Sequence, residues 1–319
     1  MIRGELVTVI GGSGFIGRYV AQRVLLEGAR LRSAQRDPRQ SWFLKSLGQL
    51  GGTQSVACDV RRPDTVARAV EGARAVVNLV GVLQGDFQGL HVDGARNVAE
   101  ACARAGVETL VHLSAIGADP ASPSAYGRTK GEGEAAVRAA FPDAVVVRPS
   151  IVFGREDQFV NRFARLIEVA SNLPGRFVPI LAPRTRFQPV FVGDVADAVV
   201  AAMRDARASA GRTYELGGPD VMTMAQLNRF IAAETGRGPR FVEVPDTVGA
   251  FIAKLGFLPG APITRDQWAM LGRDSVAAAD APGLAELGVP ATPLGAITPT
   301  YLVQYRRQGR FGQLTRYSA

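Results

Sequence analysis

The feature that most constrains how this chain folds is a glycine-rich turn near the N-terminus, in the stretch LVTVIGGSGFIGRYV that begins at Leu6. Its glycines satisfy both G-x-x-G-x-x-G and G-x-G-x-x-G spacing: Gly11, Gly12, Gly14 and Gly17. In a chain with 36 glycines about 0.45 such triplets arise by chance, so the spacing alone is a weak signal. The context strengthens it, because a β-rich run precedes the turn and an apolar helical face follows. This strand–turn–helix pattern predicts a pyrophosphate site on the amides at the helix N-terminus; the alternative is a glycine-rich turn without a ligand.

Short β-rich runs alternate with helical patterns through the first half of the chain. The predicted strands are Leu6–Ile10, Leu31–Ala34, Ser55–Cys58, Ala75–Leu79, Thr109–Ser114 and Val145–Arg148. Helices are predicted between most of them, at Pro63–Val70, Val92–Ala105 and Tyr126–Ala140. Repeated strand–helix alternation is typical of a parallel sheet with helices on both faces. The sequence therefore predicts an α/β fold with a doubly wound parallel sheet of the Rossmann type.

The regular alternation fades after Pro149, which sets the expected domain boundaries. The later patterns include a helix for which Asp194 is the expected N-cap, and a further helix in MAQLNRFIAAETG. We expect a dinucleotide-binding domain at 1–154 plus roughly 183–217, and a smaller substrate-side subdomain at roughly 155–182 plus 218–285. The remaining residues, 286–319, form a basic and aromatic C-terminal tail in which no acid follows Glu286.

Composition excludes several classes of function. The two cysteines, Cys58 and Cys102, lie far apart without a C-x-x-C pattern, and His91 and His112 are the only histidines, so no metal site is expected. The formal charge of +8 is spread over scattered arginines with no nucleic-acid motif, so no nucleic-acid partner is expected. The apolar stretches are too short to span a bilayer, and no signal peptide precedes the first strand. The expected location is cytoplasmic.

The residues after the second strand indicate which dinucleotide would bind. Arg36 follows that strand in the stretch SAQRDP, and Arg18 follows the glycine turn. Two guanidinium groups can pair with a 2′-phosphate, so NADP(H) is favoured over NAD(H). Two alternatives stay open: Asp37 would accept the ribose hydroxyls of NAD if the strand ended one residue later, and both arginines could be solvated surface residues.

A tyrosine and a lysine form the second motif, in the stretch SAYGRTKGEGE. With six tyrosines and three lysines, the pattern Y-x-x-x-K is expected about 0.06 times by chance, so Tyr126 and Lys130 form a meaningful pair. Positions i and i+4 share a helix face, and a nearby ammonium is expected to lower the pKa of the phenol. The ammonium can also donate to ribose hydroxyls. Ser114, at a strand end, could hold a carbonyl oxygen beside the phenol, or could simply cap the strand.

Taken together, these motifs resemble an extended short-chain dehydrogenase/reductase over about residues 5 to 220. The stretches HLSAIGAD, SAYGRTKGEGE, VRPSIVFGREDQFVNRF, FQPVFVGDVADA and YELGGPD are most similar to one atypical branch of that superfamily. That branch comprises the NADPH-binding accessory subunit of respiratory complex I (NADH:ubiquinone oxidoreductase) and its bacterial relatives. The resemblance implies an extended fold of this superfamily with a smaller C-terminal substrate-side subdomain.

The resemblance also implies roles for particular residues. The pyrophosphate would be held by Gly11, Ser13, Gly14, Phe15, Ile16 and Gly17, and the 2′-phosphate by Arg18 and Arg36. The adenine would face Asp59 and Val60, and the path toward the ribose would be lined by Leu79, Val80 and Gly81. Tyr126 and Lys130 would contact the nicotinamide ribose, and the nicotinamide would be bordered by Pro149, Ser150, Ile151 and Val152. If the chain is catalytic, the catalytic residues would be Tyr126, Lys130 and Ser114.

One departure from the family pattern separates two functional hypotheses. His91 stands where catalytic members carry an asparagine that holds a proton-relay water, although it could also be an ordinary helix-start residue. The first hypothesis is therefore an NADPH-binding accessory or assembly subunit with little or no turnover. It would contact complex I subunits, and a membrane surface through the C-terminal tail or the apolar segment Val248–Leu258, on the cytoplasmic face of the inner membrane. The second is a soluble NADP-dependent reductase or epimerase that uses Tyr126 and Lys130, with an unknown small-molecule substrate.

Overall fold

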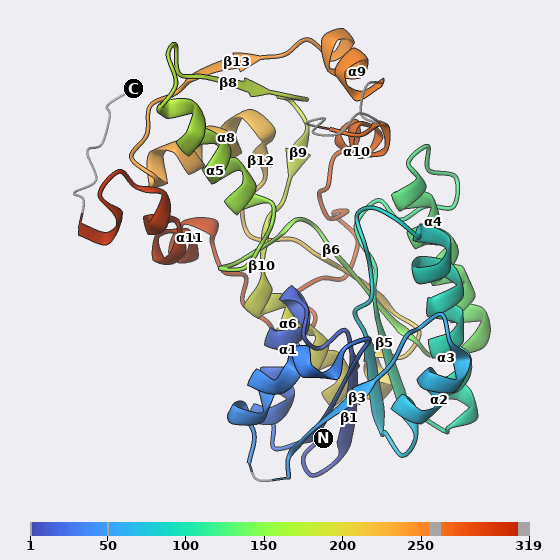
Figure 1. The fold of residues 1–319 in the computed structure, drawn as a ribbon. Helices are drawn as coiled ribbons and strands as arrows, with labels where there is room; N and C mark the ends of the chain where they lie inside the picture. The colour runs from blue at the N-terminus through green and yellow to red at the C-terminus, as the bar shows by residue number, and fades with distance from the viewer. Residues whose placement is uncertain (1, 50, 255–262, 312–319) are drawn as a thin grey trace. The chain divides into compact units, whose positions relative to one another are not determined.

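The computed structural model describes residues 2–49, 51–254 and 263–311. The chain divides into two compact units. Figure 1 colours the chain by residue number, so that the segments of each unit can be followed. Unit 1 comprises Met1–Pro149, Val192–Leu216 and Ala277–Pro290, and unit 2 comprises Ser150–Phe191, Gly217–Val276 and Ala291–Ala319. Compared with the sequence-based boundaries, this division places residues 150–154, 183–191 and 217 in unit 2 and residues 277–290 in unit 1. It also divides the expected C-terminal tail at Ala291.

Unit 1 is built on a seven-stranded parallel sheet with the order β11-β6-β5-β4-β1-β2-β3. Its strands are β1 (Leu6–Ile10), β2 (Arg30–Gln35), β3 (Thr53–Ala57), β4 (Ala75–Asn78), β5 (Thr109–Leu113), β6 (Val145–Pro149) and β11 (Thr213–Leu216). The chain adds strands outward from β1 through β2 to β3, and then returns to the other side of β1 to add β4, β5 and β6. The sheet therefore has a topological switch point between β1 and β4, the place where doubly wound sheets bind ligands.

Helices cover both faces of this sheet (Figure 1). Helices α1 (Phe15–Leu26) and α6 (Val192–Arg204) pack against each other, whereas α2 (Pro63–Val70), α3 (Gly94–Arg104) and α4 (Ala125–Ala140) form a second layer. Shorter elements are α7 (Ala206–Ser209), the 3-10 segment η1 (Pro38–Leu47) and the π-helical segment η2 (Gln88–Asp93). The α/β doubly wound parallel sheet predicted from the sequence is thus confirmed.

Valine, alanine and leucine side chains of the sheet and of α2 and α3 form the core of unit 1. Both cysteines lie in this core. Burial raises the pKa of the Cys58 thiol to about 11 and that of the Cys102 thiol to about 12. Both thiols are therefore protonated at neutral pH.

Two local predictions about unit 1 differ from the structure. Helix α6 begins at Val192, so Asp194 lies buried in the first helical turn and is not the N-cap. The helix predicted from Val92 begins earlier, as the π-helical segment at Gln88, and becomes α-helical only at Gly94. Asp194 was a reasonable N-cap by residue type, but the strand-to-helix connection is so short that the helix starts before it.

Unit 2 contains three pairs of short strands and a helical layer. The pairs are β7 (Val152–Phe153) with β10 (Val190–Phe191), β9 (Arg186–Phe187) with β12 (Met222–Thr223), and β8 (Phe177–Ile180) with β13 (Arg240–Glu243). The helices are α5 (Val160–Ser171), α8 (Met224–Glu234), α9 (Asp246–Lys254), α10 (Arg265–Leu271) and α11 (Leu294–Leu302), followed by the 3-10 turns η3 (Val303–Tyr305) and η4 (Gly309–Phe311). Residues of α5, α8, β8 and α11 share one hydrophobic core.

The C-terminal region differs from the expected basic and aromatic tail, because much of it is part of this core. Tyr301 is buried, and its hydroxyl donates to Asp157 Oδ2 over 3.1 Å. Tyr305 donates to Asn161 Oδ1 over 3.0 Å. Both hydroxyls thus make contacts inside unit 2, while Phe311 is 89% exposed. Arg316 and Tyr317 lie outside the described residues, and contact of this region with a partner stays a prediction. Leu255–Leu258 of the predicted apolar contact segment also lie outside them.

Candidate dinucleotide-binding site

The glycine turn forms a tight connection between β1 and α1. Gly11 has a φ of +86°, and its N–H donates to Ala34 O over 2.8 Å. A Cβ added at Gly17 would lie 2.1 Å from Gly11 O and 2.8 Å from Gly12 Cα, which no side chain tolerates. Gly14 N-caps α1 without a side-chain cap, and the first helical turn has no acidic residue. The loop therefore brings uncapped amides and the positive end of the helix dipole to one place, as a pyrophosphate requires.

The stretch after β4 lies next to this turn. Leu79 N–H donates to Ile10 O over 3.0 Å, and a Cβ on Gly11 would lie 3.6 Å from Leu79 Cβ. The Asn78 side chain accepts the Val80 N–H over 3.2 Å and so fixes the course of the chain toward Gly81. The two sides of the switch point, the glycine turn and Leu79–Val80–Gly81, thus lie next to each other. Their contact with a ribose stays a prediction.

The two sequence-based candidates for contacting the adenosine ribose, Arg36 and Asp37, both lie directly after β2. Strand β2 ends at Gln35, and Arg36 follows directly as an exposed residue with no hydrogen bond or ion pair to any other described residue. Asp37, in contrast, N-caps η1 by accepting the Arg39 N–H, and also accepts from the Arg39 guanidinium. The carboxylate of Asp37 is therefore already engaged, whereas Arg36 can receive a phosphate. Arg18 lies nearby on α1, its guanidinium carbon 5.2 Å from the centre of the Phe43 ring.

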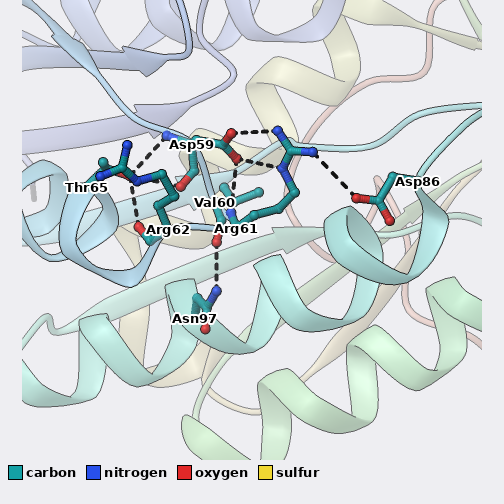
Figure 2. A network of polar contacts seen from close by, with 7 residues as sticks. All are labelled: Asp59, Val60, Arg61, Arg62, Thr65, Asp86 and Asn97. Carbon is teal, nitrogen blue, oxygen red and sulfur yellow. Dashed lines mark hydrogen bonds and ion pairs between the residues drawn. The ribbon is translucent and has the colours of Figure 1, made fainter.

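A polar network fixes the loop that carries Asp59 and Val60 (Figure 2). Arg61 makes a double contact with the Asp59 carboxylate, at 3.0 and 2.7 Å, and this lowers the pKa of Asp59. Asn97 of α3 donates to Val60 O over 2.8 Å, and Thr65 Oγ1 donates to Asp59 O over 2.8 Å. The Asp59 carboxylate therefore remains charged, and the backbone of both residues is held in one position beside the end of β3.

Tyr126 and Lys130 lie in the first two turns of α4, which Ser124 N-caps. The Lys130 ammonium donates to Leu113 O over 3.0 Å, at the end of β5. A Cβ added at Gly81 would lie 3.1 Å from Lys130 Nζ, so the ammonium adjoins the Leu79–Gly81 stretch. Burial lowers the pKa of Lys130 to about 8, with Glu134 acting in the opposite direction. The structure thus connects α4 to both β4 and β5 through this one side chain.

The expected lowering of the Tyr126 pKa is wrong. Burial raises the pKa of this phenol to about 12. The ring is packed edge-on against His91, with centroids 5.5 Å apart, and against Phe87, at 6.2 Å. The Lys130 ammonium is directed to the Leu113 carbonyl, and desolvation by these rings is therefore the dominant effect on the phenol.

His91 is a fully enclosed, neutral residue. Its Nε2 accepts the Val82 N–H over 3.0 Å, so the ring proton is on Nδ1, which lies 3.0 Å from Thr129 Oγ1. Burial and the charge of Lys130 lower the pKa of His91 to about 3. Both ring nitrogens are therefore occupied, and the imidazole cannot exchange a proton with Lys130. His91 lies in the π-helical segment η2, which α4 contacts closely, and its contact with Thr129 connects the two segments.

The glycines of the SAYGRTKGEGE stretch explain how α4 packs closely against η2. A Cβ on Gly133 would lie 2.1 Å from His91 O, and a Cβ on Gly131 would lie 2.5 Å from Pro120 N. The helix therefore approaches two backbone segments more closely than any larger residue permits. This packing places Lys130 against the sheet, a role of the glycines that their spacing in the sequence did not indicate.

Ser114 follows β5 as predicted, and its hydroxyl has an unused hydrogen-bonding capacity. The residue is buried, its N–H donates to Val147 O over 2.7 Å, and its Oγ has no hydrogen-bond partner among the described residues. Two residues earlier, His112 Nδ1 lies 3.2 Å from Asn78 Nδ2. Burial lowers the pKa of His112 to about 3, so Asn78 donates to a neutral ring. This Asn78–His112 pair, which joins β4 to β5, has no signal in the sequence, because the two residues are 34 positions apart.

The predicted nicotinamide-border residues are divided between the units. Pro149 ends β6 in unit 1, where its carbonyl accepts the Ile116 N–H over 3.1 Å. Ser150, Ile151 and Val152 belong to unit 2, where Ser150 Oγ donates to Ser275 O over 2.5 Å and Val152 pairs with Val190 in β7. Their contact with a nicotinamide stays a prediction.

Among the described residues, no group of three or more His, Cys, Asp or Glu residues is placed to hold a metal ion. Among the helices of the same residues, none combines the length and apolar composition that crossing a bilayer requires.

Comparison with known proteins identifies the class to which this fold and site belong. Residues 7–217 match the model of the NAD dependent epimerase/dehydratase family, and the chain therefore belongs to that family. A nicotinamide dinucleotide is the cofactor of this family, and the glycine turn, the switch point and the Lys130 side chain fit one.

Three proteins to which this chain is similar are a respiratory subunit, a reductase and an epimerase. Subunit 9 of the mitochondrial NADH dehydrogenase (ubiquinone) 1 alpha subcomplex of Mus musculus is 35% identical, over 92% of this chain and 78% of the mouse protein. The ceramide reductase of Caulobacter vibrioides is 29% identical, over 81% of this chain and 80% of that enzyme. The solved structure of UDP-glucose 4-epimerase from Thermotoga maritima, 17% identical, matches 95% of this chain and 99% of that one with a TM-score of 0.67, which shows the shared fold.

Proposed function

We propose that this protein is an NADP(H)-binding accessory or assembly subunit associated with NADH:ubiquinone oxidoreductase (complex I), with little or no turnover. The observation that carries the proposal is the 35% identity to a subunit of that enzyme over 92% of this chain. We further propose that the protein acts as a peripheral component on the cytoplasmic face of the inner membrane. The bound dinucleotide would then serve chiefly to hold unit 1 in its folded form, because a ligand that binds only the native state stabilises it.

The preference for NADP(H) over NAD(H) is supported by the contrast between two adjacent residues. Arg36 is exposed and has no hydrogen bond or ion pair to another described residue, whereas Asp37 caps η1 and pairs with Arg39. A ribose diol would find no available carboxylate here, and a 2′-phosphate would find a guanidinium. Arg18 would contribute a second positive charge on the same side.

Arg36→Ala is expected to weaken NADP(H) binding by about 10- to 100-fold, because a charge-assisted hydrogen bond contributes about 1.5–3 kcal/mol. NAD(H) binding should change by less than about threefold. Isothermal titration with both nucleotides measures the two affinities. Arg207→Ala is the matched control, since Arg207 is an exposed arginine on α7 of the same unit. Equal losses for both nucleotides would assign Arg36 to general phosphate attraction and remove the argument for NADP(H).

Low turnover is supported by the surroundings of Lys130. A reductase of this family must return a proton to the tyrosine after each reaction, through the lysine and solvent. Here the imidazole next to Lys130 accepts the Val82 N–H and is held neutral, and the Lys130 ammonium donates to a backbone carbonyl. Both contacts favour a residue that holds a ribose over a residue that relays protons.

The test of the accessory function is affinity purification of the tagged protein from native membranes. We expect the subunits of NADH:ubiquinone oxidoreductase to co-purify with the tagged protein. Denaturation of the purified complex should release NADP or NADPH in stoichiometric amount, identified by mass spectrometry. Recovery of the tagged protein alone, with the intact oxidoreductase left in the unbound fraction, would contradict the proposal.

A second candidate function is a reductase acting on a carbonyl substrate. It is favoured by the buried Ser114 hydroxyl, which has no partner among the described residues, and by the identity to a ceramide reductase. In this function Ser114 would donate to the carbonyl oxygen and Tyr126 would protonate it. NADPH, when bound, would supply the hydride to the carbonyl carbon.

We expect the purified protein to show no sustained NADPH oxidation with ketone substrates, including long-chain amide-linked ketones. Absorbance of NADPH measured over many equivalents of substrate is the readout. If sustained oxidation is found, and Tyr126→Phe lowers it by about 100-fold or more while leaving NADPH affinity unchanged, the reductase replaces the accessory function.

A further inference from the structure

An exposed aromatic surface lies on the 3-10 segment η1 of unit 1. Trp42 is 59% exposed, Phe43 41% and Leu47 46%, and Lys45 lies exposed between them. We call these four residues the η1 face. Three large apolar side chains within six residues are far more than single scattered surface residues require, so this face needs an explanation.

The η1 face is held in place from beneath by buried residues of the same segment. Ser41 and Leu44 are both fully buried. The Ser41 hydroxyl lies 2.8 Å from Pro38 O and 2.8 Å from Ser55 Oγ, and it also accepts from the Gln35 side chain. These contacts fix η1 against β2 and β3. Trp42 and Phe43 are thus exposed on an ordered segment. The other side of that segment already packs and makes hydrogen bonds against β2 and β3.

Positive charges accompany both rings. Lys45 Nζ lies 6.0 Å from the centre of the Trp42 ring, and Arg18 Cζ lies 5.2 Å from that of Phe43. The segment Pro38–Leu47 has no acidic residue, and the chain as a whole carries a formal charge of +8. A surface that combines tryptophan, phenylalanine and leucine with lysine and arginine is complementary to the interface of an anionic bilayer. There, rings lie at the headgroup level and cations meet phosphates.

We infer that the η1 face is a membrane-contact surface that binds bilayers containing anionic phospholipid. Trp42, Phe43 and Leu47 enter the boundary between headgroups and acyl chains, and Lys45 contacts lipid phosphates. This inference rests on the proposed peripheral location and deepens it. It assigns the membrane contact to η1, where two exposed aromatic rings, Trp42 and Phe43, lie within six residues of an exposed leucine and an exposed lysine.

The chain offers its own probe, because Trp42 and Trp268 are the only two tryptophans. Trp268→Phe leaves Trp42 as the sole emitter in the full-length protein. On addition of phosphatidylglycerol–phosphatidylcholine vesicles we expect a blue shift of Trp42 emission, and quenching by acyl chains brominated near the headgroup. Phosphatidylcholine vesicles should bind at least about tenfold more weakly, and salt should reduce the difference.

Variants of the face and of a control surface identify the residues responsible. Trp42→Ala with Phe43→Ala should weaken vesicle co-sedimentation by about tenfold or more, and Lys45→Glu should act selectively on anionic vesicles. The matched control replaces Val169 and Leu173, two exposed apolar residues of unit 2, by alanine, and should leave binding unchanged. The thermal unfolding midpoint of each variant verifies the fold. NADP(H) binding by the parent protein, measured separately, distinguishes failure of this inference from failure of the proposed function.

Three results would overturn the inference. The first is the absence of binding to anionic vesicles under conditions where NADP(H) binds normally. The second is unchanged binding by the Trp42 and Phe43 double variant. The third is Trp42 emission that is already shielded before vesicles are added, which would mean that another part of the chain or a second copy covers the face. Binding of the η1 face to an acidic protein, without binding to anionic vesicles, would also overturn the inference.

Discussion

Gly17→Ala is expected to weaken dinucleotide binding by about 100-fold or more and to destabilise unit 1. The added Cβ would lie 2.1 Å from Gly11 O and 2.8 Å from Gly12 Cα, and both atoms belong to backbone that cannot move away as a flexible side chain could. Either α1 or the glycine turn must shift by about an ångström, which removes the alignment of amides that a pyrophosphate needs. Over-packing of this kind costs about 1–3 kcal/mol of unfolding free energy. Nucleotide retained after purification, and the midpoint of thermal unfolding, report the two effects.

Gly238→Ala is the matched control for this variant. Gly238 is exposed, and a Cβ added there would meet no atom within 4 Å. Its affinity for nucleotide and its unfolding midpoint should therefore equal those of the parent protein. Normal dinucleotide affinity in Gly17→Ala would contradict the placement of the pyrophosphate at this turn, and with it the site described above.

The second large effect is a loss of stability between pH 7 and pH 5, caused by the two buried histidines. Burial lowers the pKa of both His91 and His112 from 6.5 to about 3. In the unfolded chain each imidazole takes up a proton below about pH 6.5, whereas in the folded protein both stay neutral. The unfolded state therefore binds more protons over this range, and the unfolding free energy falls as the pH falls. The two residues together account for about 4 kcal/mol between pH 7 and pH 5, from 1.36 kcal/mol per pKa unit.

Urea unfolding at a series of pH values measures this dependence. Because the chain has no other histidine, His91→Gln and His112→Gln should each reduce the slope by about half, and the double variant should be nearly independent of pH in this range. Each variant will also lower the stability at pH 7, since it disturbs the contacts with Val82 or Asn78, but the slope is unaffected by that loss. A slope that survives in the double variant would show that other groups carry the pH dependence.

Much of the fold could be predicted from the sequence because strands and helices are indicated by local patterns of apolar residues. Strand β1 and helix α2 coincide with the predicted ranges, and the other strands of the first half differ by one or two residues at their ends. Segment η1 was missed, since a short 3-10 helix has little periodicity of its own. Helix α11 was also missed, because Pro299 lies inside it and the sequence around it has the composition of a terminal tail.

The candidate site divides in the same way. The glycine turn, Arg36 and the Tyr126–Lys130 pair are recognisable from spacing along the chain, and the structure places the first of these and Lys130 beside the switch point. The contact of His91 with Val82, the pair of Asn78 with His112 and the clamp of Asn97 on Val60 depend on residues that meet only after folding. The same limitation explains the wrong expectation for the Tyr126 pKa, since the helix spacing showed the nearby cation but not the rings that desolvate the phenol.

The protonated, enclosed state of both cysteine thiols has a practical consequence for work on this protein. Neither Cys58 nor Cys102 offers a nucleophile to alkylating reagents, peroxide or maleimide dyes while the core is intact. A single thiol introduced at an exposed position, for example by Ser46→Cys, can therefore carry a spin label or a crosslinker in the otherwise native chain. Such a label would record depth in a bilayer or distance to a neighbouring subunit without removal of the natural cysteines.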